Sequence, residues 1–98
     1  MKEHVADLIE QALASLRAQG LVPDDTAPSI QVDRTRDTSH GDLASNVALA
    51  AAKAVKMPPR ELAQLVCDAL PPSAHVEKTE IAGPGFINFF LKIGRAHV

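Results

Sequence analysis

The sequence contains little of what disulfide-rich, membrane-spanning or aromatic-rich proteins depend on. Its 98 residues include one cysteine, three phenylalanines and neither tryptophan nor tyrosine. A single thiol excludes an intramolecular disulfide and is typical of a reducing compartment, so we expect a cytoplasmic location. No apolar run is long enough for the core of a signal peptide or for a membrane span, and we expect no association with a membrane.

The chain also lacks an excess of charge of one sign. Lysine and arginine number 10 against 12 aspartates and glutamates, which gives a formal net charge of -2. Proteins that bind nucleic acids usually carry a basic excess, so any contact with RNA would have to use a local patch. The 46% hydrophobic and 22% charged content is that of one globular domain. The abundance of alanine predicts closely packed helices and no deep hydrophobic ligand pocket.

No group of side chains has the spacing of a catalytic or metal site. His40 and Asp42 come nearest to an acid–base pair, but residues two apart at the start of a helix rarely face each other, and no nucleophile lies close in sequence. We interpret both as helix caps and Gly41 as a bend. The four histidines lack metal-ligand spacing, and Cys67 fits a small core residue. The sequence therefore predicts no catalytic residue and no metal site.

Apolar residues recur at three- and four-residue steps near the N-terminus and again after two adjacent prolines, which is the pattern of amphipathic helices. The first helix is expected to run for about four turns and to end where Gly20 can act as its C-cap. The other is expected to have Pro59 at its first position, where the missing N–H costs no hydrogen bond, and to end before Pro71.

Between these two helices, a further apolar stripe with helical spacing starts at Leu43 and marks the second helix in chain order. Ser39 or Asp42 can supply the oxygen that caps its N-terminus. Lys53 and Lys56 lie in its last turns, where the helix dipole favours positive charge. The sequence therefore predicts a helix from Leu43 to Lys56.

Two segments alternate apolar and polar residues in the manner of strands. Residues 29–34 predict a short, half-buried strand. Residues 74–82 predict a second strand, in which Val76, Lys78 and Glu80 share one face.

The stretch from Gly83 to Leu91 holds a Gly-Pro-Gly turn followed by all three aromatic residues. The turn joins two strands closely, which predicts an antiparallel hairpin. Because side chains alternate along a strand, Phe86, Asn88 and Phe90 share one face, and the other face is wholly apolar. An amide between two rings is suited to holding an unstacked nucleotide base. The alternative is that the rings belong to the core and the amide is merely exposed.

Several motifs occur in a fixed order. They are His-Gly-Asp-Leu-Ala-Ser-Asn-Val-Ala at 40–48, Ala-Lys at 52–53, Pro-Arg-Glu-Leu-Ala at 59–63 and Ala-Gly-Pro-Gly-Phe-Ile-Asn at 82–88. Together they closely resemble the N-terminal additional domain of arginyl-tRNA synthetases, and the match extends from the first helix to about Leu91. One motif alone is weak evidence, whereas several in register are strong evidence.

The resemblance implies an α+β fold, with a small antiparallel sheet of three or four strands flanked by about three helices. It implies a domain that docks on the corner of tRNA(Arg) and touches the D-loop. Phe86 and Asn88 would contact a D-loop base by stacking and by amide hydrogen bonding. Gly83 would offer only its backbone to the same base.

Basic residues outside this strand are candidate phosphate contacts, as an extension of the resemblance. They are Lys53 and Lys56 at the end of the second helix and Arg60 at the start of the third. An ordinary solvated face explains all three more simply.

Much of the implied enzyme has no counterpart in the sequence. The catalytic domain with its His-x-Gly-His signature is absent, as is the helical anticodon-binding domain. The resemblance therefore assigns ATP with Mg²⁺, arginine and the ligase reaction to a parent enzyme, expected to be a monomer. The 98-residue chain by itself is expected to hold no cofactor and to be inactive.

The chain divides into residues 1–92, the tRNA-binding domain, and residues 93–98. This ending resembles the translation of a sequencing-library adapter, so we interpret it as a non-native tail on a truncated gene; a genuine short tail is the alternative. For the whole chain, the rival interpretation is a stand-alone protein-interaction or dimerisation module. Such a module would use the alanine-rich helix or an exposed sheet edge.

Overall fold

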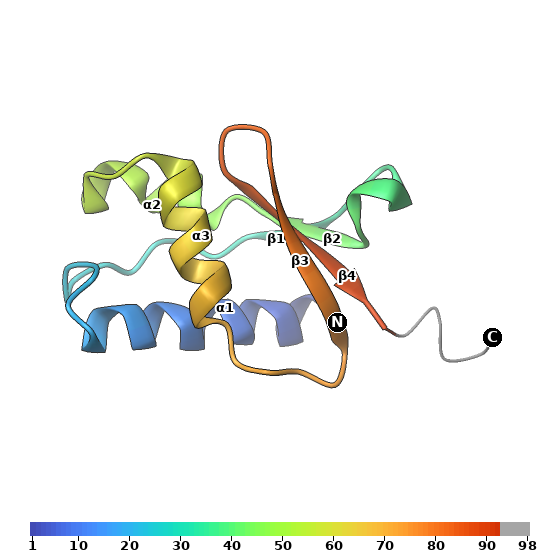
Figure 1. Cartoon of the computed structure of the whole chain (residues 1–98), viewed down its shortest axis with the longest axis horizontal. Helices are drawn as coiled ribbons and strands as arrows, with labels where there is room; N and C mark the ends of the chain where they lie inside the picture. Colours follow the sequence, from blue (N-terminus) through green and yellow to red (C-terminus); the bar gives the residue numbers. More distant parts are fainter. Residues whose placement is uncertain (93–98) are drawn as a thin grey trace.

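The computed structural model describes residues 1–92, which fold into three α-helices, one 3₁₀-helix and four strands (Figure 1). In chain order the elements are α1 (Lys2–Ala18), β1 (Val32–Arg34), η1 (Thr38–His40), β2 (Leu43–Ser45), α2 (Val47–Val55), α3 (Pro59–Ala69), β3 (Val76–Ala82) and β4 (Phe86–Leu91). The predicted α+β class is confirmed. None of the helices in this part of the chain is long and apolar enough to cross a membrane. The tail interpretation concerns residues 93–98, which lie outside the described residues.

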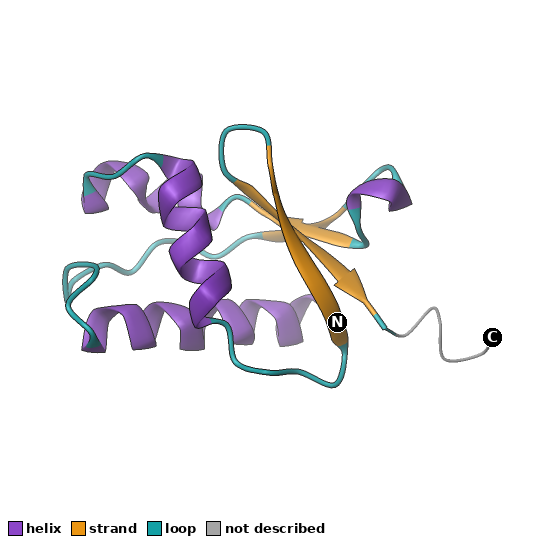
Figure 2. Ribbon diagram, in the orientation of Figure 1, coloured by secondary structure: helices purple, strands orange, loops and turns teal. Residues whose placement is uncertain are grey.

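The strands form one antiparallel sheet in the order β1-β2-β4-β3. β4 is therefore internal, with β2 along one edge and β3 along the other. The three α-helices gather on one side of the sheet (Figure 2). We call the opposite side the outer face. Strand pairing places these residues on it: Asp33, Ala44, Lys78, Glu80, Ala82, Phe86, Asn88 and Phe90.

The hydrophobic core fills the space between the helices and the inner face of the sheet. The apolar stripe of α1 is buried as predicted: Val5, Leu8, Ile9, Ala12, Leu13 and Leu16. α1 then ends in a Schellman-type turn, in which Gly20 N–H donates to the Arg17 carbonyl (3.1 Å) and Leu21 N–H to the Leu16 carbonyl (3.0 Å). Gly20 has a φ of 75°, which explains why glycine follows the last residues of the helix.

The second helix begins at Val47, and the prediction that it starts at Leu43 is wrong. Leu43–Ser45 forms β2, paired with β1 on one side and β4 on the other. Hydrogen bonds to two partners distant in sequence outweigh the helical spacing of the apolar residues. The Ser45 hydroxyl accepts the N–H of Val47 (3.2 Å), so neither Ser39 nor Asp42 caps this helix.

Residues 40–42 tie the chain to β4 instead of capping a helix. The N–H of Asp42 donates to the Phe89 carbonyl (2.8 Å), and its carboxylate accepts the N–H of Leu91 (2.8 Å). The interpretation of His40 and Asp42 as caps of the following helix is therefore wrong. Gly41 is the expected bend: its φ is 90°, and a Cβ there would lie 2.8 Å from the Phe89 carbonyl oxygen.

β3 contains an irregularity that changes which of its side chains share a face. Val76 pairs with Leu91 and Lys78 pairs with Phe90, so Glu77 is an extra residue in β3. A bulge of this kind reverses the alternation of side chains beyond it. Val76 consequently packs against the core, whereas Lys78 and Glu80 lie on the outer face, and the prediction that all three share a face is wrong.

Two predicted features of the remaining chain are confirmed. Pro59 is the first residue of α3, and β3 and β4 form an antiparallel hairpin around the Gly-Pro-Gly turn. The alternation predicted for β4 also holds, because Ile87, Phe89 and Leu91 on its inner face are 0%, 0% and 8% exposed. Burial of each large side chain in this row contributes about 1.5 to 3 kcal/mol.

We expect Gly41→Ala to lower the free energy of unfolding by about 2 to 4 kcal/mol, because the new methyl group meets the Phe89 carbonyl at a φ that favours glycine. Gly20→Ala is the matched control: its φ is also positive, but nothing lies within 4 Å of the added Cβ, so it should cost only about 1 kcal/mol. Urea denaturation measures both. Equal losses of unfolding free energy in the two variants would show that the close contact of Gly41 with β4 adds nothing to the cost of the substitution.

Candidate nucleic-acid interface

The predicted base-contacting residues lie on the outer face of β4, away from the helices. Phe86 is 40% exposed and is one of the few large apolar side chains left open to solvent. Asn88 and Phe90 lie on the same face, as the alternation predicted, but are only 6% and 7% exposed. The structure therefore leaves one ring of the three open, at the end of β4 next to the hairpin turn.

Neighbouring strands cover the other two residues of this row. The ammonium nitrogen of Lys78 lies 4.5 Å from the centre of the Phe90 ring, a cation–π contact. Lys78 also forms an ion pair with Glu80 (3.1 Å). Asn88 lies between Ala44 on β2 and Glu80 on β3, which accounts for its low exposure. Asn88 therefore lies between one exposed ring, Phe86, and one covered ring, Phe90.

The side-chain amide of Asn88 makes no hydrogen bond among the described residues. Within residues 1–92, no hydrogen bond joins it to another side chain or to the backbone, and none of its polar atoms is both inaccessible and unpaired. An amide with unused donors and acceptor, two residues from an exposed ring on the same strand face, can bind the edge of a base that stacks on that ring.

The hairpin turn brings Gly83 next to the exposed ring. A Cβ added at Gly83 would lie 3.6 Å from Cδ2 of Phe86, ordinary van der Waals contact, and the φ of Gly83 is 56°. The carbonyl of Gly83 accepts a hydrogen bond from the guanidinium of Arg60. The sequence placed Arg60 among candidate phosphate contacts and missed this link. A cation in the first turn of a helix, where the dipole disfavours it, was the available signal.

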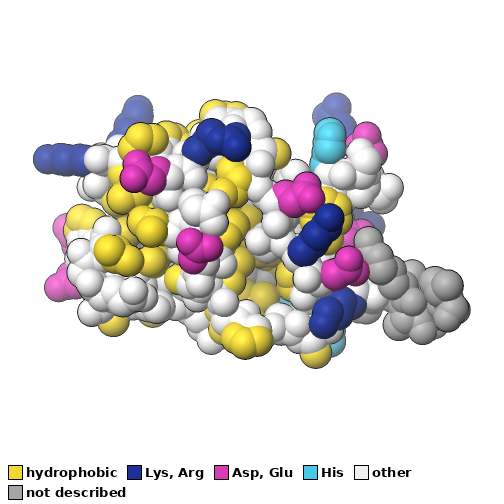
Figure 3. All heavy atoms as spheres, in the orientation of Figure 1, with side chains coloured by type: hydrophobic (Ala, Val, Ile, Leu, Met, Phe, Trp, Pro, Cys, Tyr) yellow, Lys and Arg dark blue, Asp and Glu magenta, His cyan; other side chains and the backbone are white. Residues whose placement is uncertain are grey.

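The two candidate lysines lie elsewhere. Lys53 is in the last turn of α2, and Lys56 follows that helix as its C-cap with a φ of 62°. Both are exposed, and both complement the negative end of the helix dipole. On the face shown in Figure 3, basic side chains are interspersed with acidic ones and do not merge into one patch.

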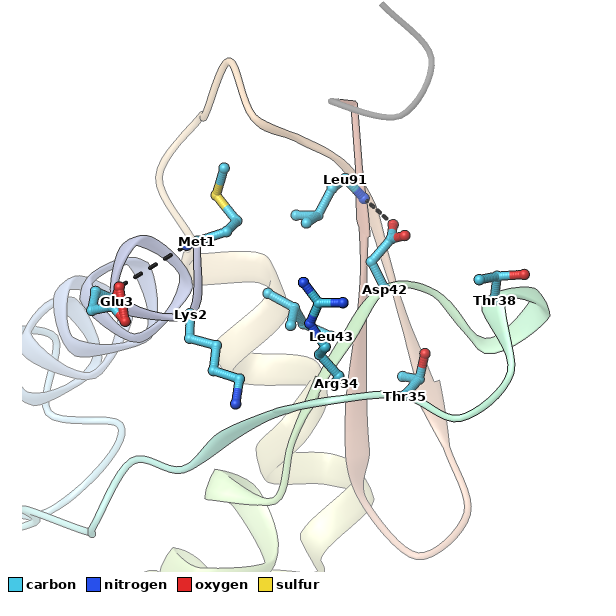
Figure 4. A pocket seen from close by; sticks show the side chains of 9 residues that line it. All are labelled: Met1, Lys2, Glu3, Arg34, Thr35, Thr38, Asp42, Leu43 and Leu91. Atoms are coloured by element: carbon cyan, nitrogen blue, oxygen red, sulfur yellow. Dashed lines mark hydrogen bonds and ion pairs between the residues drawn. The ribbon is translucent and has the colours of Figure 1, made fainter.

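A cleft of about 440 Å³ opens where α1 begins and β4 ends (Figure 4). Its lining residues are Met1, Lys2, Glu3, Arg34, Thr35, Thr38, Asp42, Leu43 and Leu91. The Asp42 carboxylate is already held by the N–H of Leu91. None of the residues predicted to touch RNA is among those that line this cleft, so it is separate from the candidate interface.

Two titratable groups of the described chain have clearly shifted pKa values. The Ser39 N–H and hydroxyl hydrogen-bond to the exposed Asp37 carboxylate and lower its pKa. This capping of η1 was not foreseen from the sequence. Burial raises the pKa of the Cys67 thiol, opposed in part by a hydrogen bond with Thr79, and Cys67 packs against the core as predicted.

The fold is shared with solved arginyl-tRNA synthetases. The Thermus thermophilus enzyme matches 97% of this chain over 14% of its own length, with a TM-score of 0.72 and 27% identity. The Plasmodium falciparum enzyme matches 92% of the chain over 16% of its own length, with a TM-score of 0.74; at 10% identity this likeness shows the fold alone. The structural class is thus that of a domain found within aminoacyl-tRNA synthetases.

Sequence comparison identifies the family. The sequence-family model of the arginyl tRNA synthetase N terminal domain matches residues 3–91. The chain belongs to this family. Arginine–tRNA ligases from Shewanella amazonensis and Shewanella oneidensis are 62% and 59% identical to it over 91 residues. These residues are 93% of the chain but 16% of each relative, so the chain spans about a sixth of their length.

We expect the Cys67 thiol to be alkylated by iodoacetamide more slowly in the folded chain than in the chain unfolded by urea, both at pH 8. The raised pKa leaves less thiolate. Because the Cys67 thiol has a higher pKa in the folded state than in the unfolded state, this pKa difference stabilises the folded state. Its contribution to the free energy of unfolding is complete below the unfolded-state pKa and is lost as pH rises through the folded-state pKa. Cys67→Ala should remove this alkaline loss; equal alkylation rates would contradict the expectation.

Proposed function

We propose that this domain binds tRNA(Arg) at the D-loop, with the outer face of β4 against an unstacked base. The observation that carries the proposal is the 40% exposed ring of Phe86 on the same strand face as the unused amide of Asn88, in a chain of the arginyl-tRNA synthetase N-terminal domain family. Phe86 stacks on the base, and Asn88 binds its edge. Gly83, beside the ring, offers only its backbone atoms to the base and has no side chain that would occupy the space of the base.

The charges around this row favour contact with a base over contact with a phosphate. Glu80 is the neighbour of Asn88 on β3, and Asp33 lies in the same cross-strand row on β1. Their carboxylates repel phosphate oxygens. Lys53 and Lys56, which are exposed and lie at the C-terminal end of α2, are the proposed phosphate contacts outside the row.

The domain acts as part of a larger enzyme in this proposal. Its relatives are arginine–tRNA ligases of which it spans 16%; a parent of that kind would use ATP with Mg²⁺ and arginine, as a cytoplasmic monomer. The domain would hold the tRNA elbow, and binding energy from a remote contact can be used to orient the reacting end. The 98-residue chain alone would be inactive in arginylation.

Phe86→Ala should weaken binding of an arginine-accepting tRNA transcript by about 1 to 3 kcal/mol, the range for one base–aromatic stack. Fluorescence anisotropy with labelled tRNA measures this. The matched control is Leu21→Ala, since Leu21 is also exposed (46%) but lies after α1, off the sheet. The proposal fails if both variants, or neither, lose affinity, or if tRNA(Arg) does not bind the unchanged chain.

Asn88→Ala should reduce the preference for the natural D-loop base by about 1 kcal/mol, the value of one hydrogen bond. The measurement compares affinities for the natural transcript and for one with a substituted D-loop base. The unchanged chain should discriminate between them, and the variant should not. Undiminished discrimination would exclude Asn88 from base recognition, and self-association that hides the outer face would favour the interaction-module interpretation.

A further inference from the structure

The hairpin turn that precedes Phe86 contacts the start of α3 at two points. A Cβ added at Gly85 would lie 2.7 Å from the Cβ of Pro59, so the turn backbone is pressed against the first residue of α3. The guanidinium of Arg60, the next residue, donates a hydrogen bond to the carbonyl of Gly83. The two contacts hold both glycines of the turn on one helix end.

The location of Arg60 argues against its being a simple solvated charge. It lies in the first turn of α3, where the positive end of the helix dipole disfavours a cation. Neither of the salt bridges found among residues 1–92 includes it. The charge-assisted hydrogen bond to the Gly83 carbonyl, 23 residues away in sequence, offsets this unfavourable location.

The position of this hairpin turn determines where the exposed Phe86 ring lies. Phe86 directly follows Gly85 and pairs with Ala82 across the hairpin. Its ring is adjacent to Gly83, since a Cβ at that position would be 3.6 Å from Cδ2. Gly85 N–H donates to the Ala82 carbonyl (3.3 Å) and closes the turn. A shift of the turn would therefore displace the ring.

We propose that Arg60 is a positioning residue for RNA recognition: with the Gly85–Pro59 contact it clamps the turn, so that Phe86 presents its ring to the base in a fixed orientation. This inference rests on the proposed function of Phe86 and Asn88. It replaces the interpretation of Arg60 as a phosphate contact. Holding the ring in place before binding reduces the entropy lost when the base stacks.

The first measurement needs no RNA. Amide hydrogen exchange at position 85, whose N–H closes the turn, is compared in the unchanged chain, Arg60→Gln and Gly85→Ala. Both variants should exchange faster at this amide. Lys53→Gln is the matched control, since it removes one exposed positive charge from the neighbouring helix without touching the turn, and its exchange should be unchanged.

The second measurement separates positioning from charge. Arg60→Gln and Gly85→Ala should each weaken tRNA binding about three- to tenfold and reduce discrimination against the altered D-loop base. The slope of log affinity against log salt concentration should stay the same, because no phosphate contact is lost. Arg60→Lys, which keeps the charge but loses the guanidinium fork, should not restore the affinity. Gly85→Ala changes no charge and gives an independent check.

Four results would overturn the inference. A salt slope smaller by about one unit in Arg60→Gln, with affinity restored by Arg60→Lys, would make Arg60 a phosphate contact. Unchanged exchange at position 85 in Arg60→Gln would show that the clamp does not hold the turn. Loss of affinity in Phe86→Ala without any loss in Arg60→Gln would leave the proposed function standing and reject only the positioning role. Absence of tRNA binding by the unchanged chain would reject both.

Discussion

The pairing of β4 along both of its edges is the constraint on which the rest of the domain depends. Ile87 and Phe89 on its inner face are fully buried, and its backbone is bonded to β2 and β3. Asp42 extends this pairing through its N–H and its carboxylate. The helices pack against the inner face of the sheet, to which this central strand contributes its buried row. β4 pairs with β3 through a short hairpin, but its pairing with β2 joins distant parts of the chain and costs loop-closure entropy.

One strand thus serves both the core and the proposed interface, because successive side chains point to opposite faces. The inner row supplies stability, and the outer row supplies one open ring and one side-chain amide that makes no hydrogen bond among residues 1–92. An acidic chain of net charge -2 gains little from phosphate neutralisation, so recognition through stacking suits its surface better than recognition through charge. The Lys78–Glu80 pair and the covered Phe90 ring leave the exposed part of the proposed interface concentrated beside the turn.

Much of the fold could be predicted, and the errors share one physical cause. α1 with its terminal Gly20, Pro59 at the start of α3, and the Gly-Pro-Gly hairpin all follow from local backbone preferences. β2 was predicted as helix because Leu43 continues an apolar stripe, yet its backbone pairs with strands on both sides. The bulge at Glu77 likewise depends on the register with β4, which no local pattern contains.

For the candidate site, the sequence by itself determined which residues share a face: alternation put Phe86 and Asn88 together on β4, and motif order indicated the family. Only the tertiary structure decided how available they are, since exposure depends on neighbouring strands that local patterns do not specify. It left Phe86 open, covered Phe90 with Lys78, and brought Arg60 to the Gly83 carbonyl across 23 residues. Local dihedral preferences act within a few residues, whereas burial and such contacts arise only when distant segments pack.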